Sequence, residues 1–150
     1  MEHYQASVLI NAPITSVFHF HDDTHNLIKI TPPDVQVTFT TRGAPGLGQD
    51  IYLRVRQFVV FTTTWHVRIT EYQPPGKMVD EQIRGPFAFW KQTRLLRQVG
   101  SATELTDIVE YKLPLGVLGK IAAWLFVRRQ IASMFAYRQQ QTKRILEATS

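Results

Sequence analysis

Three polar side chains in the C-terminal half of the chain lie where a β-hairpin would bring them together. The residues Val99–Ala102 form a turn between two alternating segments, and pairing across this turn sets Arg94 opposite Asp107, with Gln92 one step away on the same face. A charge buried alone is costly, so this register favours mutual pairing of Arg94 with Asp107. A one-residue slip would turn all three side chains to the other face.

This pair could serve one of three purposes. It could neutralise itself at the wall of a cavity and do nothing more. Alternatively, Arg94 could hold the carboxylate or other anionic head of a ligand, oriented by Asp107 and assisted by Gln92, because a guanidinium binds planar anions through two parallel hydrogen bonds. In the third alternative, Asp107 transfers a proton. The face is otherwise mainly apolar, so we place it inward; its other members are Trp90, Leu96, Leu105, Val109 and Tyr111.

A second group of chemically capable side chains lies near the N-terminus. His21 and His25 are four residues apart, so they could share a helix face and bind a metal ion, or they could be exposed residues around a helix break. The glycines between Gly43 and Gly48 precede a strand, so they lack the helix N-terminus that holds phosphate. We expect no metal and no cofactor, and we assign no catalytic residue.

The amino-acid composition excludes several classes of protein and of site. The 150 residues contain no cysteine, which excludes a disulfide scaffold, a cysteine-ligated zinc site and a thiol nucleophile. The length and the 44% hydrophobic content predict one domain, spanning 1–150. The net charge of +5 is uneven, because residues 111–150 hold seven basic side chains and one acidic one, or +6. No signal peptide or membrane span is recognisable, which predicts a cytoplasmic protein.

Hydrophobic periodicity predicts the elements that position these residues. Alternating segments rich in β-branched and aromatic residues predict strands at about 2–10, 34–42, 49–58, 61–72, 77–84, 87–98 and 102–112. Pro13 suits the first turn of a short helix, and Asp22-Asp23 could cap a second one. From about Val117 to Glu147, apolar residues at three- and four-residue steps predict one long helix.

The order of these elements predicts an α+β fold. A single helix with an apolar face must cover a surface, and the sheet is the surface available. We therefore predict a curved seven-stranded antiparallel sheet wrapped around the long C-terminal helix, with two short helices between the first and second strands. Such an arrangement would leave a cavity between sheet and helix, where small ligands bind.

Two details of the predicted sheet stay open. The segment Phe58–Phe61 has no turn residue, so either the strand continues and turns at Thr62–Thr64, or an apolar tip packs on a second copy, gates the cavity or touches lipid. Pairing between the strands predicted at 77–84 and 87–98 would set Glu81 opposite Trp90 on the cavity wall and turn Asp80 outward.

Several motifs together resemble one bacterial family. They are Ile10-Asn-Ala-Pro13, Val17-Phe18, Asn26-Leu27, Ile30-Thr-Pro-Pro33, Glu71-Tyr-Gln-Pro-Pro75, Asp80-Glu-Gln82, Gly85-Pro-Phe87 with Trp90, the patterned segment from Thr103 to Gly119, and Met134-Phe-x-Tyr-Arg138. Over nearly its full length the chain resembles the ligand-binding SRPBCC family of the START-like helix-grip superfamily, whose relatives include lipid-transfer domains and polyketide cyclases. This chain differs from the family in one motif: members often carry Trp-x-His-x-His, where this chain has Trp90-Lys-Gln92-Thr-Arg94.

The resemblance implies a helix-grip fold with an internal pocket and no defined activity. The function it implies is binding, sequestration or transfer of a small hydrophobic ligand, such as a lipid, a polyketide-like molecule or an aromatic compound. The alternative is a cyclase, aromatase or dehydratase reaction in the same cavity. A regulator that acts through the basic helix is a third interpretation.

The partner we expect is therefore a small hydrophobic molecule, with or without an anionic head group, and not a nucleic acid. Contact with a membrane surface, and the choice between monomer and homodimer, stay open. The residues that we expect to contact the ligand are Leu53, Val55, Trp65, Val67, Trp90, Gln92, Arg94, Asp107, Val109, Tyr111, Ile121, Leu125 and Phe135.

Overall fold

The computed structural model describes residues 1–57, 61–114, 116 and 120–149. Seven strands form one antiparallel sheet in the order β1-β7-β6-β5-β4-β3-β2, so the first two strands of the chain lie at opposite edges. The strands are β1 (Glu2–Ile10), β2 (Val35–Arg42), β3 (Asp50–Gln57), β4 (Phe61–Gln73), β5 (Lys77–Arg84), β6 (Phe89–Val99) and β7 (Ala102–Lys112).

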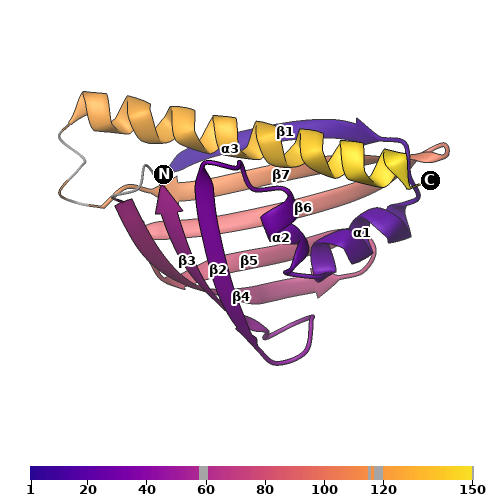
Figure 1. Ribbon diagram of the computed structural model, residues 1–150, viewed down its shortest axis with the longest axis horizontal. Coiled ribbons are helices and arrows are strands. Elements are labelled where there is room, and N and C mark those ends of the chain that lie inside the picture. The colour runs from indigo at the N-terminus through magenta and orange to yellow at the C-terminus, as the bar shows by residue number, and fades with distance from the viewer. Residues whose placement is uncertain (58–60, 115, 117–119, 150) are drawn as a thin grey trace.

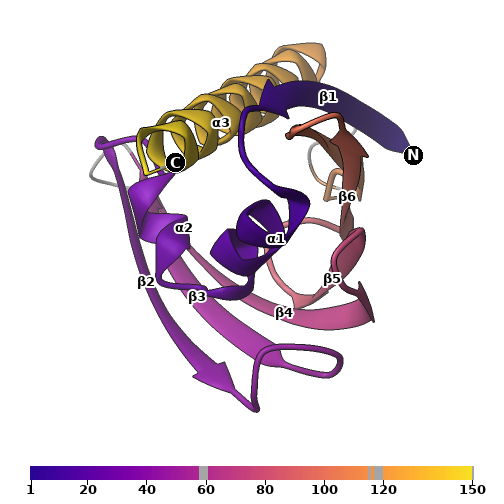
Figure 2. The same cartoon turned by 90° about the vertical axis from the view of Figure 1, so that its right-hand side faces the viewer.

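In the part of the chain that the structure describes, three helices accompany the sheet: α1 (Ile14–Asp22), α2 (Asn26–Lys29) and α3 (Ile121–Ala148). The sheet curves around the long helix α3, which runs along its concave side (Figure 1). The view in Figure 2 shows α1 and α2 at one end of the space that the sheet encloses. The predicted α+β helix-grip fold is therefore confirmed, with the two short helices between the first and second strands.

Hydrogen bonds hold α3 along the edge strand β1. The Gln139 side-chain amide donates to the Ala6 carbonyl at 2.9 Å, and Lys143 Nζ donates to the Leu9 carbonyl at 2.8 Å. Apolar packing adds to these bonds, because Ile131 and Phe135 from α3 are buried in one cluster with side chains of β6 and β7. The other end of the molecule has its own buried cluster, built around α1. The cavity described below lies in a fold that is packed at both ends.

The hairpin of β6 and β7 has the register that its turn predicts. Arg94 pairs with Asp107, and Trp90 pairs with Tyr111. Gly100 supplies the turn with a φ of +61°, a conformation that side-chain-bearing residues rarely adopt. Every second residue of β7 from Thr103 onward is buried, so the face that we placed inward does face the interior.

The predicted register of β5 against β6 is wrong by one residue. Asp80 pairs with Gln92 and Glu81 pairs with Lys91, so Asp80 faces inward and Glu81 outward. The connection between these strands explains the difference. The Gln82 side chain donates to the Phe87 carbonyl at 2.8 Å and accepts from the Phe87 amide at 3.3 Å, which makes a wider loop than a simple turn at Gly85-Pro86.

Two predicted helix boundaries also need correction. Helix α1 runs through Asp22, so Asp22-Asp23 end this helix rather than begin the next. Helix α2 begins at Asn26 and has no side-chain cap; Asp23 instead accepts a hydrogen bond from the His25 amide at 3.0 Å. The long helix is described from Ile121 onward, and residues 117–119 of its predicted start lie outside the described residues.

The strand boundaries settle one alternative for the segment between β3 and β4. Strand β3 ends at Gln57 and β4 begins at Phe61, so Thr62–Thr64 lie within β4, and a turn there is excluded. The hypothesis of an apolar tip concerns residues 58–60 and the Phe61 side chain, which lie outside the described part of the chain. Among the described helices, none is both long and apolar enough to cross a membrane.

Candidate functional site

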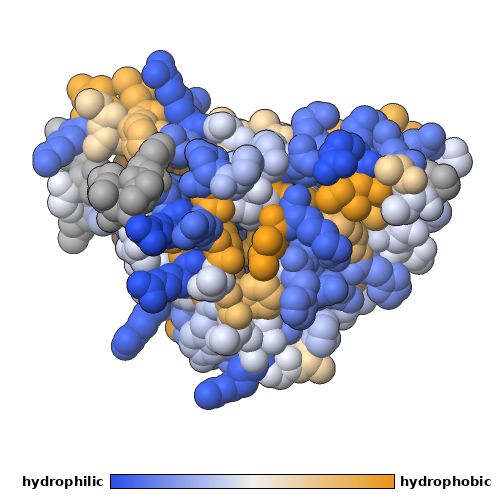
Figure 3. All heavy atoms as spheres, viewed as in Figure 1, coloured by the Kyte–Doolittle hydropathy of each residue, from blue (hydrophilic) through white to orange (hydrophobic). Residues whose placement is uncertain are grey.

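A cavity of about 390 Å³ lies between the concave face of the sheet and α3. Strands β3 to β6 form one wall, α3 forms the facing wall, and α1 and α2 contribute at one end. In Figure 3, apolar side chains are visible in a hollow below α3, between polar side chains on either side. The volume falls in the range of about 300–1,000 Å³ that is typical of pockets for small organic ligands.

Apolar and aromatic side chains make most of this wall. Leu53, Val55 and Val67 line it from β3 and β4. Next to them, the Trp65 and Trp90 rings meet edge to face, with centroids 5.3 Å apart. Two further aromatic residues, Phe87 and Phe135, contact Trp90 with centroid distances of 4.9 and 6.4 Å. Burial of a ligand's apolar surface against such a wall is the main source of affinity that it offers.

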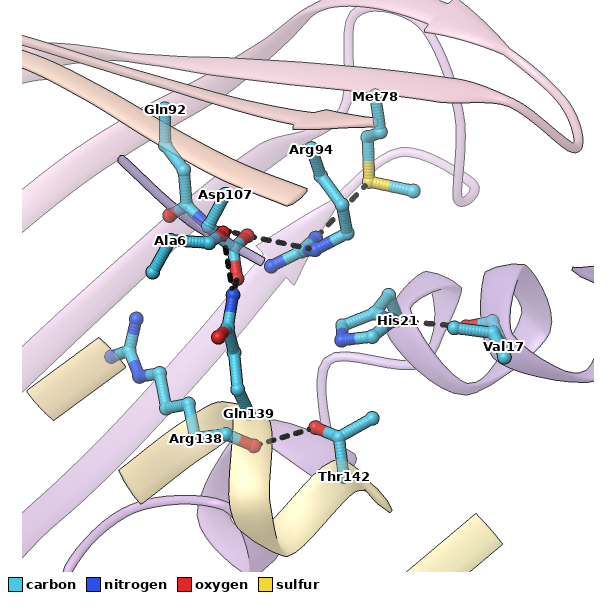
Figure 4. Close-up of polar contacts among 10 residues, drawn as sticks. All are labelled: Ala6, Val17, His21, Met78, Gln92, Arg94, Asp107, Arg138, Gln139 and Thr142. Atoms are coloured by element: carbon cyan, nitrogen blue, oxygen red, sulfur yellow. Dashed lines mark hydrogen bonds and ion pairs between the residues drawn. The ribbon is translucent and has the colours of Figure 1, made fainter. Parts of the chain in front are cut away.

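The opposite end of the cavity is polar, and Asp107 organises the side chains behind its wall. Asp107 is only 3% exposed. Its carboxylate accepts hydrogen bonds from Gln92 Nε2 at 3.3 Å and from Gln139 Nε2 at 3.1 Å, and it lies 3.6 Å from Arg94 Nε (Figure 4). The carboxylate therefore has partners from β6 and from α3, and it stands behind the cavity rather than on its wall.

Two arginines reach this end of the cavity from opposite walls. Arg94 extends from the sheet and Arg138 from α3 (Figure 4), and both line the cavity. The Nε atoms of both are buried, and neither donates a hydrogen bond to a described residue. Burial and the nearby charge of Arg94 lower the pKa of Arg138 to about 10, against the opposing effect of Asp107 and Asp80. The Arg138 side chain therefore remains cationic at neutral pH.

Asp80 is a carboxylate of β5 that lines the cavity itself. Burial raises its pKa to about 6, although the charges of Arg94 and Arg138 oppose the rise. No described residue forms a hydrogen bond or an ion pair with Asp80. A carboxyl group with these properties changes its charge close to neutral pH, which is where an acid or base is most useful.

His21 lies on the cavity wall at the end of α1. Its Nδ1 is 2.9 Å from the Val17 carbonyl, which can only accept, so Nδ1 carries the proton and Nε2 is left as an acceptor. Burial lowers the pKa of His21 well below its usual range, and the charge of Arg94 adds to this effect. The imidazole is therefore neutral at physiological pH.

The structure places eight of the thirteen predicted contact residues on the cavity wall, namely Leu53, Val55, Trp65, Val67, Trp90, Gln92, Arg94 and Phe135. Asp107, Val109 and Tyr111 are buried, but they pack behind that wall. Ile121 and Leu125 are 76% and 41% exposed, so the prediction that they contact a ligand inside the cavity does not agree with their position. The buried face of α3 begins only at Ile131.

The sequence prediction missed several polar residues of the wall, among them Arg138, His21 and Asp80, and two of these three carried a signal. Arg138 lies in the helical stripe, where a charged residue among apolar ones suggests a buried site. His21 follows Val17 by four residues on a helix and so shares its buried face. Asp80 was turned outward by the one-residue error in the β5–β6 register. Within the described residues, no group of histidine, aspartate or glutamate side chains is arranged to hold a metal ion.

Among the comparisons with known proteins, the one with solved structures supports the fold. No protein-family model matches the sequence, and no curated protein matches it. Solved structures similar to this one include TTHA0849 from Thermus thermophilus, with a TM-score of 0.81, 16% identity and coverage of 99% of both chains. A START superfamily protein from Mycobacterium smegmatis has a TM-score of 0.76 at 13% identity and also covers 99% of both chains.

A third similar structure belongs to a larger protein. The di-domain ARO/CYC BexL from the BE-7585A biosynthetic pathway has a TM-score of 0.79 and 19% identity; the match covers 97% of this chain and 50% of BexL. At these identities, the similarity establishes the fold alone. The chain thus has the helix-grip fold that the sequence motifs predicted.

Proposed function

We propose that this protein binds a small hydrophobic molecule in the cavity between its sheet and α3, and that it sequesters or transfers that molecule. The observation that carries the proposal is the cavity of about 390 Å³, whose walls are aromatic and aliphatic over most of their area and polar at one end. A pocket of this composition supplies affinity through apolar contact and orientation through a few polar groups. The neighbours with START and ARO/CYC in their names support a ligand-binding role for this fold.

Native mass spectrometry of the freshly purified protein tests this proposal directly. We expect part of the protein to carry a mass increment that disappears on denaturation, with the released molecule identifiable after solvent extraction. A titration with N-phenylnaphthylamine, a neutral apolar fluorophore, covers the case in which purification removes the ligand. The proposal fails if the protein carries no molecule and does not bind this fluorophore.

A cyclase- or dehydratase-type reaction is the second candidate, and the position of Asp80 favours it. Asp80 faces the cavity with a pKa raised to about 6, and the neutral His21 presents Nε2 to the same space. Either group could accept a proton from a bound substrate. An enzyme of this type would convert the extracted molecule with a pH-dependent rate, and Asp80→Asn would remove that dependence. A carrier would leave the molecule unchanged.

Contact with a membrane surface is a further part of the proposed transfer function. Ile121 and Leu125 are exposed at the N-terminal end of α3, where apolar side chains gather on the surface (Figure 3, upper left), and the exposed Arg128 follows on the same helix. An apolar surface flanked by basic residues is typical of interfacial helices. Flotation with vesicles that contain an anionic phospholipid tests this contact. The double variant Ile121→Ser and Leu125→Ser should lose vesicle binding and keep binding of N-phenylnaphthylamine.

A further inference from the structure

Arg138 is a partly buried cation for which the described part of the protein supplies no counter-charge within ion-pair distance. Its guanidinium lies over the Phe135 ring, 5.1 Å from the ring centroid, and its Nε is buried without a hydrogen-bond partner. Arg94, on the facing wall, has Asp107 at 3.6 Å, but this carboxylate already accepts hydrogen bonds from Gln92 and Gln139. A buried charge without a partner is strongly unfavourable, so the arrangement calls for an anion between the two walls.

The charges around this point favour one further negative charge when Asp80 is protonated. Arg94 and Arg138 contribute two positive charges, and Asp107 contributes one negative charge. Asp80, on the same wall, contributes a second negative charge only when it is ionised. With Asp80 protonated, the site carries a net charge of +1. A single oxyanion would then balance it.

We propose that the ligand carries one carboxylate or comparable oxyanion on an apolar body, and that Arg138, together with the outer nitrogens of Arg94, binds this group at the polar end of the cavity. This inference rests on the proposed binding function and specifies its ligand class. The sequence alone suggested that Arg94, oriented by Asp107, holds the anion. The proposed position lies nearer to α3, where Arg138 takes part. The apolar body of the ligand would extend toward the aromatic wall formed by Trp65, Phe87 and Trp90.

Asp80 makes the binding of this anion dependent on pH. The groups that face Asp80 are Arg94 from β6, Asp107 from β7 and Arg138 from α3, with Glu81 adjacent on β5 and the neutral His21 across the cavity from α1; its partner on β4 is the uncharged Ile69. Above a pH of about 6, Asp80 is ionised and repels a second anion. Below that pH, Asp80 is neutral, and its carboxyl O–H can donate a hydrogen bond to the ligand. An anionic ligand should therefore bind more tightly as the pH falls.

Two fluorescent probes with a common skeleton separate the anion from the apolar body. Anilinonaphthalene sulfonate carries a sulfonate that stays ionised across the pH range of the experiment, and N-phenylnaphthylamine is the same skeleton without it. Loss of a hydrogen-bonded charge partner costs about 1.5–3 kcal/mol, so Arg138→Met should weaken binding of the sulfonate about 10- to 100-fold. The same variant should change binding of the neutral probe by less than about threefold.

Arg129→Met is the matched control, because Arg129 is an exposed arginine on the same helix and lies outside the cavity. This variant changes the net charge as Arg138→Met does, and it should leave both probes unaffected. In the wild type, the affinity for the sulfonate should rise as the pH is lowered from about 8 to about 5, and Asp80→Asn should keep it high and flat over this range. The Asp80→Asn profile also tests the proposal if Arg138→Met does not fold.

The possible results separate the two proposals. If Arg138→Met weakens both probes equally, or if Arg129→Met weakens the sulfonate as much as Arg138→Met does, the anion site is refuted and the apolar binding function stands. If the wild type binds the sulfonate with no pH dependence and Asp80→Asn changes nothing, the coupling to Asp80 is refuted. If neither probe binds the wild type, both the anion site and the proposed function fail.

Discussion

The substitution Asp107→Ala tests whether the buried polar cluster is a structural unit that the fold depends on. Asp107 is 3% exposed and accepts hydrogen bonds from Gln92 and Gln139, with Arg94 Nε 3.6 Å away. Removal of the carboxylate leaves a buried guanidinium without its nearest counter-charge and leaves two amide groups short of an acceptor. Removal of one partner of a buried ion pair typically costs about 3–5 kcal/mol.

The structure places the expected loss for Asp107→Ala at the lower end of that range. Asp80 also faces Arg94 and remains as a compensating charge. We therefore expect a loss of about 3 kcal/mol in the free energy of unfolding. For a domain of this length, that loss corresponds to a fall of roughly 6–12 °C in Tm. Urea denaturation followed by tryptophan fluorescence, together with calorimetry, measures both quantities.

Two comparisons make this prediction specific. Glu104→Ala breaks the exposed ion pair with Arg97 on the same two strands, and it should cost less than about 1 kcal/mol. The double variant Arg94→Met and Asp107→Leu removes both charges together, and it should recover at least about 1 kcal/mol relative to Asp107→Ala. An Asp107→Ala variant that is as stable as Glu104→Ala would refute the argument that the cluster holds a buried charge.

Three further predictions concern single residues. Burial raises the pKa of Asp80 from 3.8 to about 6, so the folded chain binds this proton more tightly than the unfolded chain, and the resulting stabilisation is complete below pH 3.8 and is lost as the pH rises through about 6. Asp80→Asn should therefore be more stable than the wild type by roughly 2–3 kcal/mol near neutral pH and by much less near pH 4. Urea denaturation at both pH values measures this difference, and an equal gain at both would contradict the titration. Gln139→Leu removes the side-chain donor to the Ala6 carbonyl and one of the two amide donors to the Asp107 carboxylate, and it should cost about 1–3 kcal/mol in calorimetry, whereas no loss would mean that these bonds do not hold α3 to the sheet. Gly100→Ala places a methyl group on a residue with a φ of +61° and should cost about 1–2 kcal/mol from backbone strain alone, since no atom lies within 4 Å of the added carbon; a neutral result would contradict that turn geometry.

The sequence predicted the fold well because its signals were local and repeated. In β1 and β7, every second residue is more buried than its neighbours, and the β6–β7 hairpin has a four-residue turn whose glycine sets the register. The inward position of Arg94 opposite Asp107 followed from that turn alone. The eight predicted residues on the cavity wall lie on strands or on the central part of α3, where periodicity determines which face is buried.

The predictions that failed depended on contacts that periodicity does not encode. The Gln82 side chain widens the loop between β5 and β6 by bonding to the Phe87 backbone, and this places Asp80 rather than Glu81 in the cavity. The apolar stripe of α3 extends to Ile121, but Ile121 and Leu125 are exposed, whereas Trp124 and Val127 from the same turns pack against the core. Arg138 lies in the stripe, and only the three-dimensional arrangement shows that it lacks an ion-pair partner among the described residues.

The measurement that tests the binding cavity most directly compares two neighbouring threonines of β4. Thr63 lines the cavity, whereas Thr64 is exposed on the outer face of the sheet, opposite Arg54. Thr63→Trp adds an indole to the cavity, and Thr64→Trp adds the same group outside. We expect Thr63→Trp to weaken binding of N-phenylnaphthylamine at least about tenfold and Thr64→Trp to leave it unchanged. Equal affinity of both variants and the wild type would show that the apolar probe does not bind in this cavity, and it would contradict the proposed function.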